Sequence, residues 1–522
     1  MDSSWPDVPA LAARNGIIID VGTDEQIASH IAPSTNVIDL GGRLAIPGFI
    51  ESHGHFTGLG DSLLQLRLAD TKSWEEIVAT VGAAAKSAPP GEWIRGRGWH
   101  QEKWTSVPSP NVEGFPVHAS LDAVSLDNPV VLTHASGHGA YANARALELS
   151  GITRDTPNPP GGEIVRDRSG NPAGFLKETA QRLLKTPPAD DPALVEKQAM
   201  LASREAIAKG VTTFEDAGSS FATIDTLRRM SAEGRLPIRL WMMVRDFNDR
   251  LKANLARSRT IGGADEHFTV KAIKKTIDGA LGSRGAWLLE PYADLPSSTG
   301  LNTTSVEEIE QASRLAIENG YQMAVHAIGD RANRETLNIY ERVFKDNPGQ
   351  KDLRWRIEHA QHLHPDDIPR FHALGVIASM QGIHATSDAP FVVARLGPRR
   401  AEEGAYVWRK LIDSAAFVVN GTDTPVEDVN PIANFYASVS RKVKSGSEFF
   451  PNQRMRRDEA LRSYTSIAAY AAFEENRKGT LAPGKLADIV VLSKDIMTIP
   501  EDEIQSARVD YTIIGGKVVY RR

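Results

Sequence analysis

The sequence predicts an α/β protein: a (β/α)8 barrel carrying a small β-sandwich domain built from both ends of the chain. Three observations support this fold. Apolar strands alternate with helical stretches through the middle of the chain. Short strands are concentrated near both ends. Histidines and an aspartate stand where predicted strands end, which is where barrels of this kind place their active sites. A chain of 522 residues has material for a barrel and a smaller domain.

The predicted small domain combines residues 1–44 with residues 480–522. Its C-terminal part contains a hairpin over 511–520, around a Gly-Gly turn. Residues 45–479 are expected to form the barrel, with an insertion around 60–190. Both chain ends therefore lie in the same predicted domain.

Eight strands are expected in the barrel. Each is a short apolar run followed by a helical stretch, which indicates βα units around a parallel sheet. The expected strands are 45–50, 129–133, 211–216, 268–275, 321–326, 355–359, 376–380 and 417–423.

Five polar residues fall at the carboxyl ends of these strands. His53 and His55 are two residues apart, so on a strand both imidazoles point to the same side. His326, His359 and Asp423 close three further strands. Barrel packing favours Val, Ile and Leu at such positions, and buried imidazoles need partners. A bound metal would satisfy several of them at once.

Each residue taken singly has a structural alternative. An isolated histidine is more often hydrogen-bonded in a core or at a surface than bound to a metal. Asp423 could be a turn residue, Lys274 and Lys275 could be a solvated pair, and Glu178 could cap or pair on a helix. The joint pattern carries the metal-site hypothesis.

Composition excludes several classes of function. The net charge of −6 offers no basic field for nucleic acid and no polybasic patch for membranes. There is no cysteine, so thiolate catalysis, disulfides and Cys-bound zinc are excluded. Neither the phosphate-binding loop of nucleotide triphosphatases nor the Gly-x-Ser-x-Gly turn of serine hydrolases is present. We expect a small-molecule substrate, with no nucleic acid or membrane partner, and leave a homodimer open.

Six stretches of this sequence resemble the amidohydrolase superfamily, and more narrowly its YtcJ-like group, which includes N-substituted formamide deformylases. The stretches span nearly the whole chain in the family's order: Pro47–Phe56, Asp278–Ala286, Val325–Asp330, Ile357–Gln361, Gly421–Val426 and Gly479–Asp488.

The resemblance implies a site with one or two divalent metal ions, usually zinc. By motif, His53 and His55 would bind the more buried ion, and His326 and His359 the second. Asp423 would bind the first ion and act as the proton shuttle. Members with two ions often bridge them with an N6-carboxylysine at the end of the fourth strand. Lys274 is the expected residue here, with Lys275 as the register alternative and Glu178 as the carboxylate alternative.

The resemblance further implies hydrolysis of a C–N bond in an amide or formamide. A divalent cation lowers the pKa of a bound water toward neutrality, which supplies the attacking hydroxide. Asp423 would accept the proton and return it to the leaving amine. Ester hydrolysis, deamination or decarboxylation on the same metal site are alternatives, as is a catalytically inactive scaffold or regulatory barrel.

Four further residues are expected near the substrate. His384 follows strand seven and would orient the substrate carbonyl, although Gly382-Ile383 replaces the Pro-Thr usual in the family at that point. Arg284 is expected either to bind a polar group of the substrate or to brace its loop. His138 is expected to contact the substrate, with a structural role as the alternative. Trp99 is expected to line an apolar pocket, with packing in a core as the alternative.

The N-terminus carries neither the basic segment nor the apolar segment of a signal peptide, so a cytoplasmic location is expected. It is also shorter than the family pattern by one or two strands. An upstream segment bearing a targeting signal therefore stays open.

Overall fold

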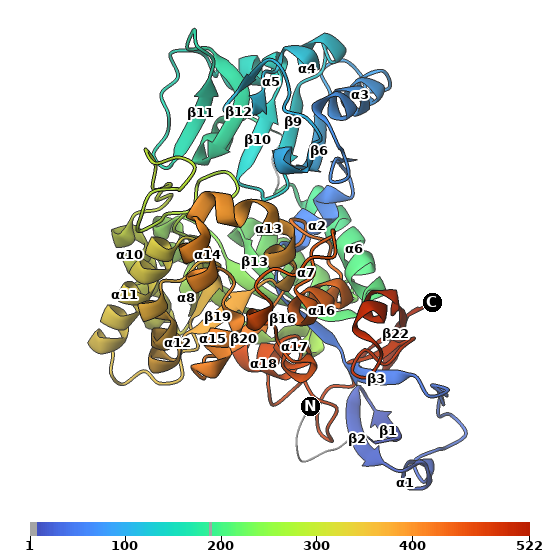
Figure 1. Ribbon diagram of the computed structural model, residues 1–522. Helices are drawn as coiled ribbons and strands as arrows, with labels where there is room; N and C mark the ends of the chain where they lie inside the picture. Colours follow the sequence, from blue (N-terminus) through green and yellow to red (C-terminus); the bar gives the residue numbers. More distant parts are fainter. Residues whose placement is uncertain (1–7, 187–189) are drawn as a thin grey trace.

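A computed structural model describes residues 8–186 and 190–522 of the chain. Eight parallel strands form its barrel, and helices surround them (Figure 1). The predicted (β/α)8 fold is confirmed. In spatial order the strands are β4 (Phe49–Gly54), β13 (Val211–Ser219), β14 (Arg239–Val244), β16 (Phe268–Thr276), β17 (Gln322–Ala327), β18 (Arg356–His359), β19 (Ile377–Met380) and β20 (Val418–Asn420).

The segment that follows β20 joins the barrel back to β4. The backbone N–H of Asp423 donates to the carbonyl of His53 at 2.7 Å, and that of His55 donates to Thr424 at 2.7 Å. These two bonds place the first and last candidate ligands side by side.

The predicted strand 45–50 is in fact two strands. β3 (Leu44–Pro47) belongs to the small domain, and β4 starts at Phe49 in the barrel. Proline ends β3 because it has no N–H to donate onward. At Gly48 a Cβ atom would stand 2.1 Å from Thr212 Oγ1, so the chain passes β13 too closely for any side chain. His53 therefore lies within β4 rather than beyond it.

The predicted barrel strand 129–133 is also wrong. It corresponds to β9 (Val130–His134), which lies in the insertion. The barrel strand that was not predicted is β14, whose six residues are all buried. A short apolar run such as this one does not reveal from its sequence whether it forms a strand or part of a buried helix.

The helices cover the outside of the barrel. In α10, buried Ile309, Ala312, Ser313 and Ala316 recur at helical spacing, Ser305 caps the N-terminus and the helix ends at Gly320. The helices between and after the barrel strands are α6 (Pro192–Ala208), α7 (Phe221–Ala232), α8 (Asn248–Ser258), α9 (Gly263–Glu266), α10 (Val306–Asn319), α11 (Asp330–Asp346), α12 (Ile368–Leu374), α13 (Gly382–Leu396), α14 (Pro398–Gly404), α15 (Trp408–Asp413), α16 (Pro431–Ser440), α17 (Arg457–Ser463) and α18 (Ser466–Ala471).

The insertion after α2 (Phe56–Ser62) forms a separate lobe with its own apolar core (Figure 1). Its six-stranded sheet has the order β11-β12-β10-β9-β6-β5. Its last two strands, β11 and β12, form an antiparallel hairpin. Its elements are β5 (Leu66–Arg67), α3 (Trp74–Ala85), β6 (Ile94–Trp99), β7 (Asn111–Val112), β8 (Phe115–Pro116), α4 (Ala119–Val124), β9, β10 (Gly139–Ala142), α5 (Ala144–Ser150), β11 (Gly162–Arg166) and β12 (Pro172–Glu178).

Strands from both ends of the chain form the small β-domain. Its four-stranded sheet has the order β23-β22-β21-β3, with β3 antiparallel to β21. Residues 1–7 of the predicted small domain and 187–189 of the predicted insertion lie outside the described residues. The elements of the small β-domain are β1 (Ala10–Arg14), β2 (Ile17–Gly22), α1 (Asp24–Ala28), β3, β21 (Ile489–Leu492), β22 (Val509–Ile514) and β23 (Lys517–Arg521).

A buried ion pair fixes the small domain to the barrel. Arg239, at the start of β14, donates from Nε and Nη2 to the carboxylate of Asp488 at 2.7 and 3.0 Å. The same carboxylate accepts the backbone N–H of Gly515 at 2.8 Å. Among the described helices, none combines the length and the apolar content needed to cross a bilayer.

Candidate metal centre and active-site pocket

Five of the six side chains expected to bind metal, the four histidines and Asp423, lie together at the carboxyl end of the barrel. His53 is in β4, His326 in β17 and His359 is the last residue of β18. His55 directly follows β4, and Asp423 follows β20. Because the strands are parallel, their carboxyl ends open on the same face of the barrel.

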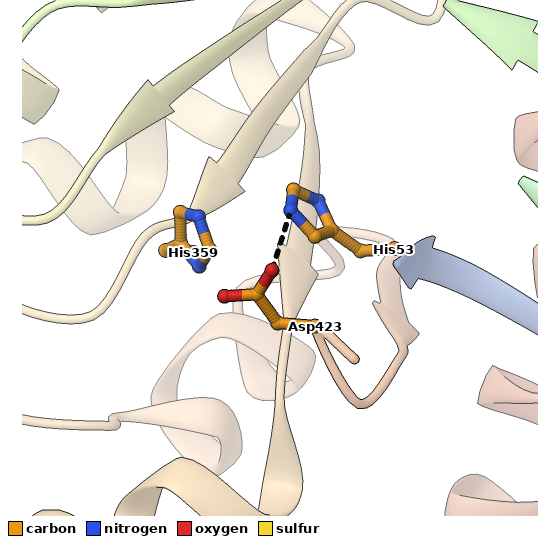
Figure 2. A group of neighbouring side chains, drawn as sticks. All are labelled: His53, His359 and Asp423. Carbon is orange, nitrogen blue, oxygen red and sulfur yellow. Dashed lines mark ion pairs between the residues drawn. The ribbon is translucent and has the colours of Figure 1, made fainter. Parts of the chain in front are cut away.

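Ligand atoms converge at this face (Figure 2). One atom each from His53, His359 and Asp423 lie within 4.8 Å of one another. Asp423 Oδ1 is 3.4 Å from Nε2 of His53 and 3.2 Å from Nε2 of His55. The ring centroids of His326 and His359 are 4.5 Å apart. All five side chains therefore surround one small volume.

The backbone is unusual at two of these residues. His359 has φ of +77° and Asp423 has φ of +56°, in the left-handed region that side chains other than glycine seldom adopt. Such conformations occur where surrounding structure holds a residue for a functional purpose. Here they occur at the last residue of β18 and in the segment that follows β20.

Outer contacts set the orientation of two imidazoles. His53 Nδ1 contacts the buried carboxylate of Glu358, and His359 Nδ1 is 2.8 Å from Gln381 Oε1. With Nδ1 engaged in both rings, Nε2 is the nitrogen left to face the centre. Metal-binding histidines are held by outer partners in this same manner.

Burial sets the protonation of the site. It lowers the pKa values of His326 and His359 well below their ordinary value, so both imidazoles are neutral, the form that binds metal. Burial alone would raise the pKa of Asp423, but the imidazoles of His53 and His55 hold it well below its usual range. The centre therefore offers neutral nitrogens and an ionised carboxylate.

Unsatisfied buried atoms indicate that a cation fits this site. His326 Nε2 and Asp423 Oδ1 are buried and form no well-aligned hydrogen bond among the described residues, although His326 Nε2 lies 3.5 Å from Asp278 Oδ1 and Asp423 Oδ1 lies 3.2 Å from His55 Nε2. Leaving such atoms unpaired in a protein interior is costly. Imidazole nitrogen and carboxylate oxygen suit zinc and related divalent ions. The donor set thus fits a divalent metal.

Lys274, rather than Lys275, faces the centre. Lys274 lies in β16 and its Nζ is 3.4 Å from His53 Nε2. The Nζ of Lys275 points the other way and donates to the carbonyl of Asp246 at 3.0 Å. Burial lowers the pKa of Lys274 to about 8, which raises its share of neutral amine.

Glu178, the carboxylate alternative, belongs to the insertion. Its Oε2 is 2.7 Å from His138 Nδ1. The ring of His138 in turn lies 5.0 Å from that of His326. His138 and Glu178 therefore lie beside the candidate metal centre, on the side of the insertion.

A pocket opens beside the metal centre. The insertion forms one wall, and loops and helices at the barrel's carboxyl end form the other. Residues of both walls contribute polar and aromatic side chains: His100, His134 and His138 from the insertion, and His384, Asp388 and Phe391 from α13.

His384 is well placed to contact a substrate. It lies in the first turn of α13, and its Nε2 is 4.0 Å from Asp423 Oδ2. Gln361 Nε2 is 3.0 Å from His384 Nδ1. When Gln361 donates to Nδ1, Nε2 is the N–H donor directed to the pocket.

Two other expected substrate contacts lie elsewhere. Arg284 pairs with Asp294 at 3.0 Å and so braces its loop, which is the structural alternative for that residue. Trp99 is fully buried in the core of the insertion and donates from Nε1 to the carbonyl of Leu132 at 2.9 Å, so the expectation that it walls the pocket is not supported.

Sequence reasoning missed the residues that support the ligands. Arg356 is buried and lies between the carboxylates of Glu358 and Glu215, with its Nε 2.7 Å from Glu358 Oε1. Gln381 orients His359. The one available signal was the presence of charged residues on β18, a strand whose interior should be apolar.

This arrangement defines a class of protein: a metal-dependent hydrolase on a (β/α)8 barrel. The profile of the amidohydrolase family matches residues 36–520, so the chain belongs to that family. A solved "uncharacterized metal-dependent hydrolase" from Pyrococcus horikoshii superposes with a TM-score of 0.75 and 26% identity, covering 94% of this chain and 95% of that one.

Curated relatives cover nearly the whole chain. Protein LONG AFTER FAR-RED 3 of Arabidopsis thaliana is 35% identical, over 99% of this chain and 89% of its own length. The putative amidohydrolase YtcJ of Bacillus subtilis is 30% identical, over 98% and 96%. The N-substituted formamide deformylase of Arthrobacter pascens is 28% identical, over 98% and 95%. The expected resemblance is confirmed.

Proposed function

We propose that this hydrolase cleaves the C–N bond of a small amide or formamide, using a divalent cation that is usually zinc in such sites. The observation that carries the proposal is the convergence of His53, His359 and Asp423 beside a pocket. His55 and His326 would complete the set. The named activity of the deformylase relative supports the choice of bond.

Each group at the site has a distinct task. When bound, the cation supplies Lewis acidity and makes water a stronger acid. Asp423, ionised in the resting site, accepts a proton at its carboxylate and later returns it to the leaving nitrogen. His384 Nε2 donates a hydrogen bond to the substrate carbonyl oxygen, whose negative charge grows during attack.

Lys274 is proposed to carry an N6-carboxylate that bridges two ions. Support comes from its place in the fourth barrel strand, its contact with His53 and the lowered pKa of its amine. Mass spectrometry of the native holoprotein and metal stoichiometry in Lys274→Ala test this. We expect loss of about one metal equivalent in the variant. Two equivalents retained by Lys274→Ala would contradict a bridging role.

Metal analysis and a substrate screen test the function as a whole. The purified protein is assayed for bound zinc, iron and manganese, then with N-formyl and N-acyl amines and matched esters. We expect bound metal, and turnover of amides that a chelator abolishes and added zinc restores. Turnover of the esters alone, or of a deamination substrate, would reassign the bond that is cleaved. A folded protein that binds none of these ions would favour the scaffold alternative.

A further inference from the structure

The pocket contains an ionised carboxylate that the proposed chemistry does not use. Asp388 lies on α13, four residues after His384, and both side chains line the pocket. Four residues of α-helix span about 6 Å along the axis, and residues so spaced share one face. Asp388 therefore stands one helical turn away from the group that would bind the substrate carbonyl.

One oxygen of Asp388 is engaged by the protein and the other is not. The hydroxyl of the buried Tyr406 donates to Asp388 Oδ2 at 2.5 Å. Oδ1 has no hydrogen-bond partner in residues 8–186 and 190–522, and no lysine or arginine of this part of the chain forms an ion pair with Asp388. Oδ1 of this half-buried carboxylate is therefore free to accept a hydrogen bond from a ligand in the pocket.

The charged groups around Asp388 leave it ionised near neutral pH. The pKa of Asp388 is raised to about 6, mainly by burial and to a smaller extent by Glu427, while His384, the Tyr406 hydroxyl and Lys103 oppose that rise. Lys103 is itself exposed on the insertion side of the pocket. At pH 7 the wall thus carries a negative charge that no neighbouring cation neutralises by direct contact.

Apolar side chains line the same pocket as this charge. They include Leu281 and Phe391, and the Phe391 ring stacks on that of His100 with centroids 5.8 Å apart. The pocket therefore offers both apolar contacts and an anionic group to a substrate.

We infer that Asp388 is a specificity-determining residue that binds a protonated amine at the far end of the substrate. The substrate class is then an amide or formamide with a second, cationic nitrogen, separated from the scissile carbonyl by a short apolar spacer. This inference rests on the proposed function, because it places the carbonyl at Asp423 and His384.

Three formamides test the inference with zinc-loaded holoprotein. They are the formamides of dimethylaminopropylamine, which is cationic, of its neutral isostere isohexylamine, and of γ-aminobutyrate, which is anionic. We expect kcat/KM to favour the cationic compound over the neutral one by about 10- to 100-fold, the range of a charge-assisted hydrogen bond. The anionic compound should be the poorest substrate of the three.

Matched variants distinguish a direct contact between Asp388 and the substrate cation from a general negative electrostatic potential in the pocket. Asp388→Asn keeps an acceptor for Tyr406 and removes the charge, so the preference should fall to near unity while turnover of the neutral formamide persists. Tyr406→Phe keeps the charge, and Glu427→Gln removes a different acid of the same pocket, so both should keep the preference. Thermal unfolding of each variant checks that it is folded.

The inference is overturned if the wild type shows no preference, or if Asp388→Asn retains the preference. An equal loss in Glu427→Gln would also overturn it, since a diffuse negative field would then explain the selectivity. If no formamide is hydrolysed, the proposed function fails separately. The affinities of the cationic and neutral formamides are then measured by calorimetry for wild type and Asp388→Asn. The inference stands if wild type binds the cationic compound more tightly and Asp388→Asn does not, and it fails otherwise.

Discussion

Replacing Glu358 by glutamine should weaken metal binding without preventing folding. Glu358 is fully buried, contacts His53 Nδ1 and pairs with Arg356. Glutamine has nearly the same volume and its carbonyl can still accept the His53 N–H. The substitution removes the negative charge that makes His53 a stronger ligand.

The expected magnitude follows from the contacts that are lost. Outer partners of metal-binding histidines typically contribute about 10- to 100-fold in metal affinity, or about 1.4–2.8 kcal/mol. Arg356 would keep one of its two carboxylates, Glu215, so the apoprotein should lose about 3 kcal/mol of stability, the lower end for a broken buried pair.

Glu215→Gln is the matched control. Glu215 is equally buried and contacts the same arginine, and in the described part of the chain it forms no hydrogen bond or ion pair with His53. Zinc affinity is measured by competition with a chromophoric chelator, and apoprotein stability by denaturant unfolding. Both variants should be destabilised to a similar degree, whereas only Glu358→Gln should lose zinc affinity. Equal zinc affinity in the two folded variants would refute the proposed role of Glu358.

Three further outcomes are expected. Asp423→Asn should keep much of the metal but lose about 10²- to 10⁴-fold in kcat, measured beside metal content, and persistent activity would contradict its role as proton shuttle. Gly421→Ala should destabilise the fold and reduce metal content, because its Cβ would lie 2.5 Å from the backbone nitrogen of His53; a wild-type melting temperature would count against this. Asp488→Asn should cost about 3 kcal/mol at pH 7, since Arg239 lowers the pKa of Asp488 against the effect of burial. The ion pair stabilises the fold fully above pH 3.8, the ordinary pKa of the carboxyl, and this stabilisation is lost as the pH falls through the lowered pKa of the folded state. The free energies of unfolding of wild type and Asp488→Asn, measured with denaturant, should therefore become equal in acid.

The fold class could be predicted because its signal is distributed along the chain. Alternation of apolar runs with amphipathic helices survives an error in any single strand. Two errors did occur and compensated each other: β9 was counted in the barrel and β14 was missed. The sequence of a parallel strand does not indicate which sheet the strand joins, because its pairing depends on residues distant in sequence.

Candidate ligands could be predicted because strand ends are recognisable and histidine is rare among barrel-lining residues. Their supporting residues could not, since an acid such as Glu358 has the same sequence signature whether it is solvated or buried against His53. Trp99 shows the converse problem. A tryptophan near a predicted pocket and one in the core of an inserted lobe look alike until the insertion's own sheet is known.

The pairing of β3 with β21 has a consequence for how the chain folds during synthesis. β3 leaves the ribosome early, whereas its antiparallel partner is among the last segments made. The inserted lobe is continuous in sequence and has its own core, so it can fold while translation proceeds. Asp423 is translated after every other candidate ligand, so the lobe that roofs the pocket can be complete before the metal centre exists. Premature termination before β21 would leave β3 as an unpaired edge, which favours aggregation of the truncated chain.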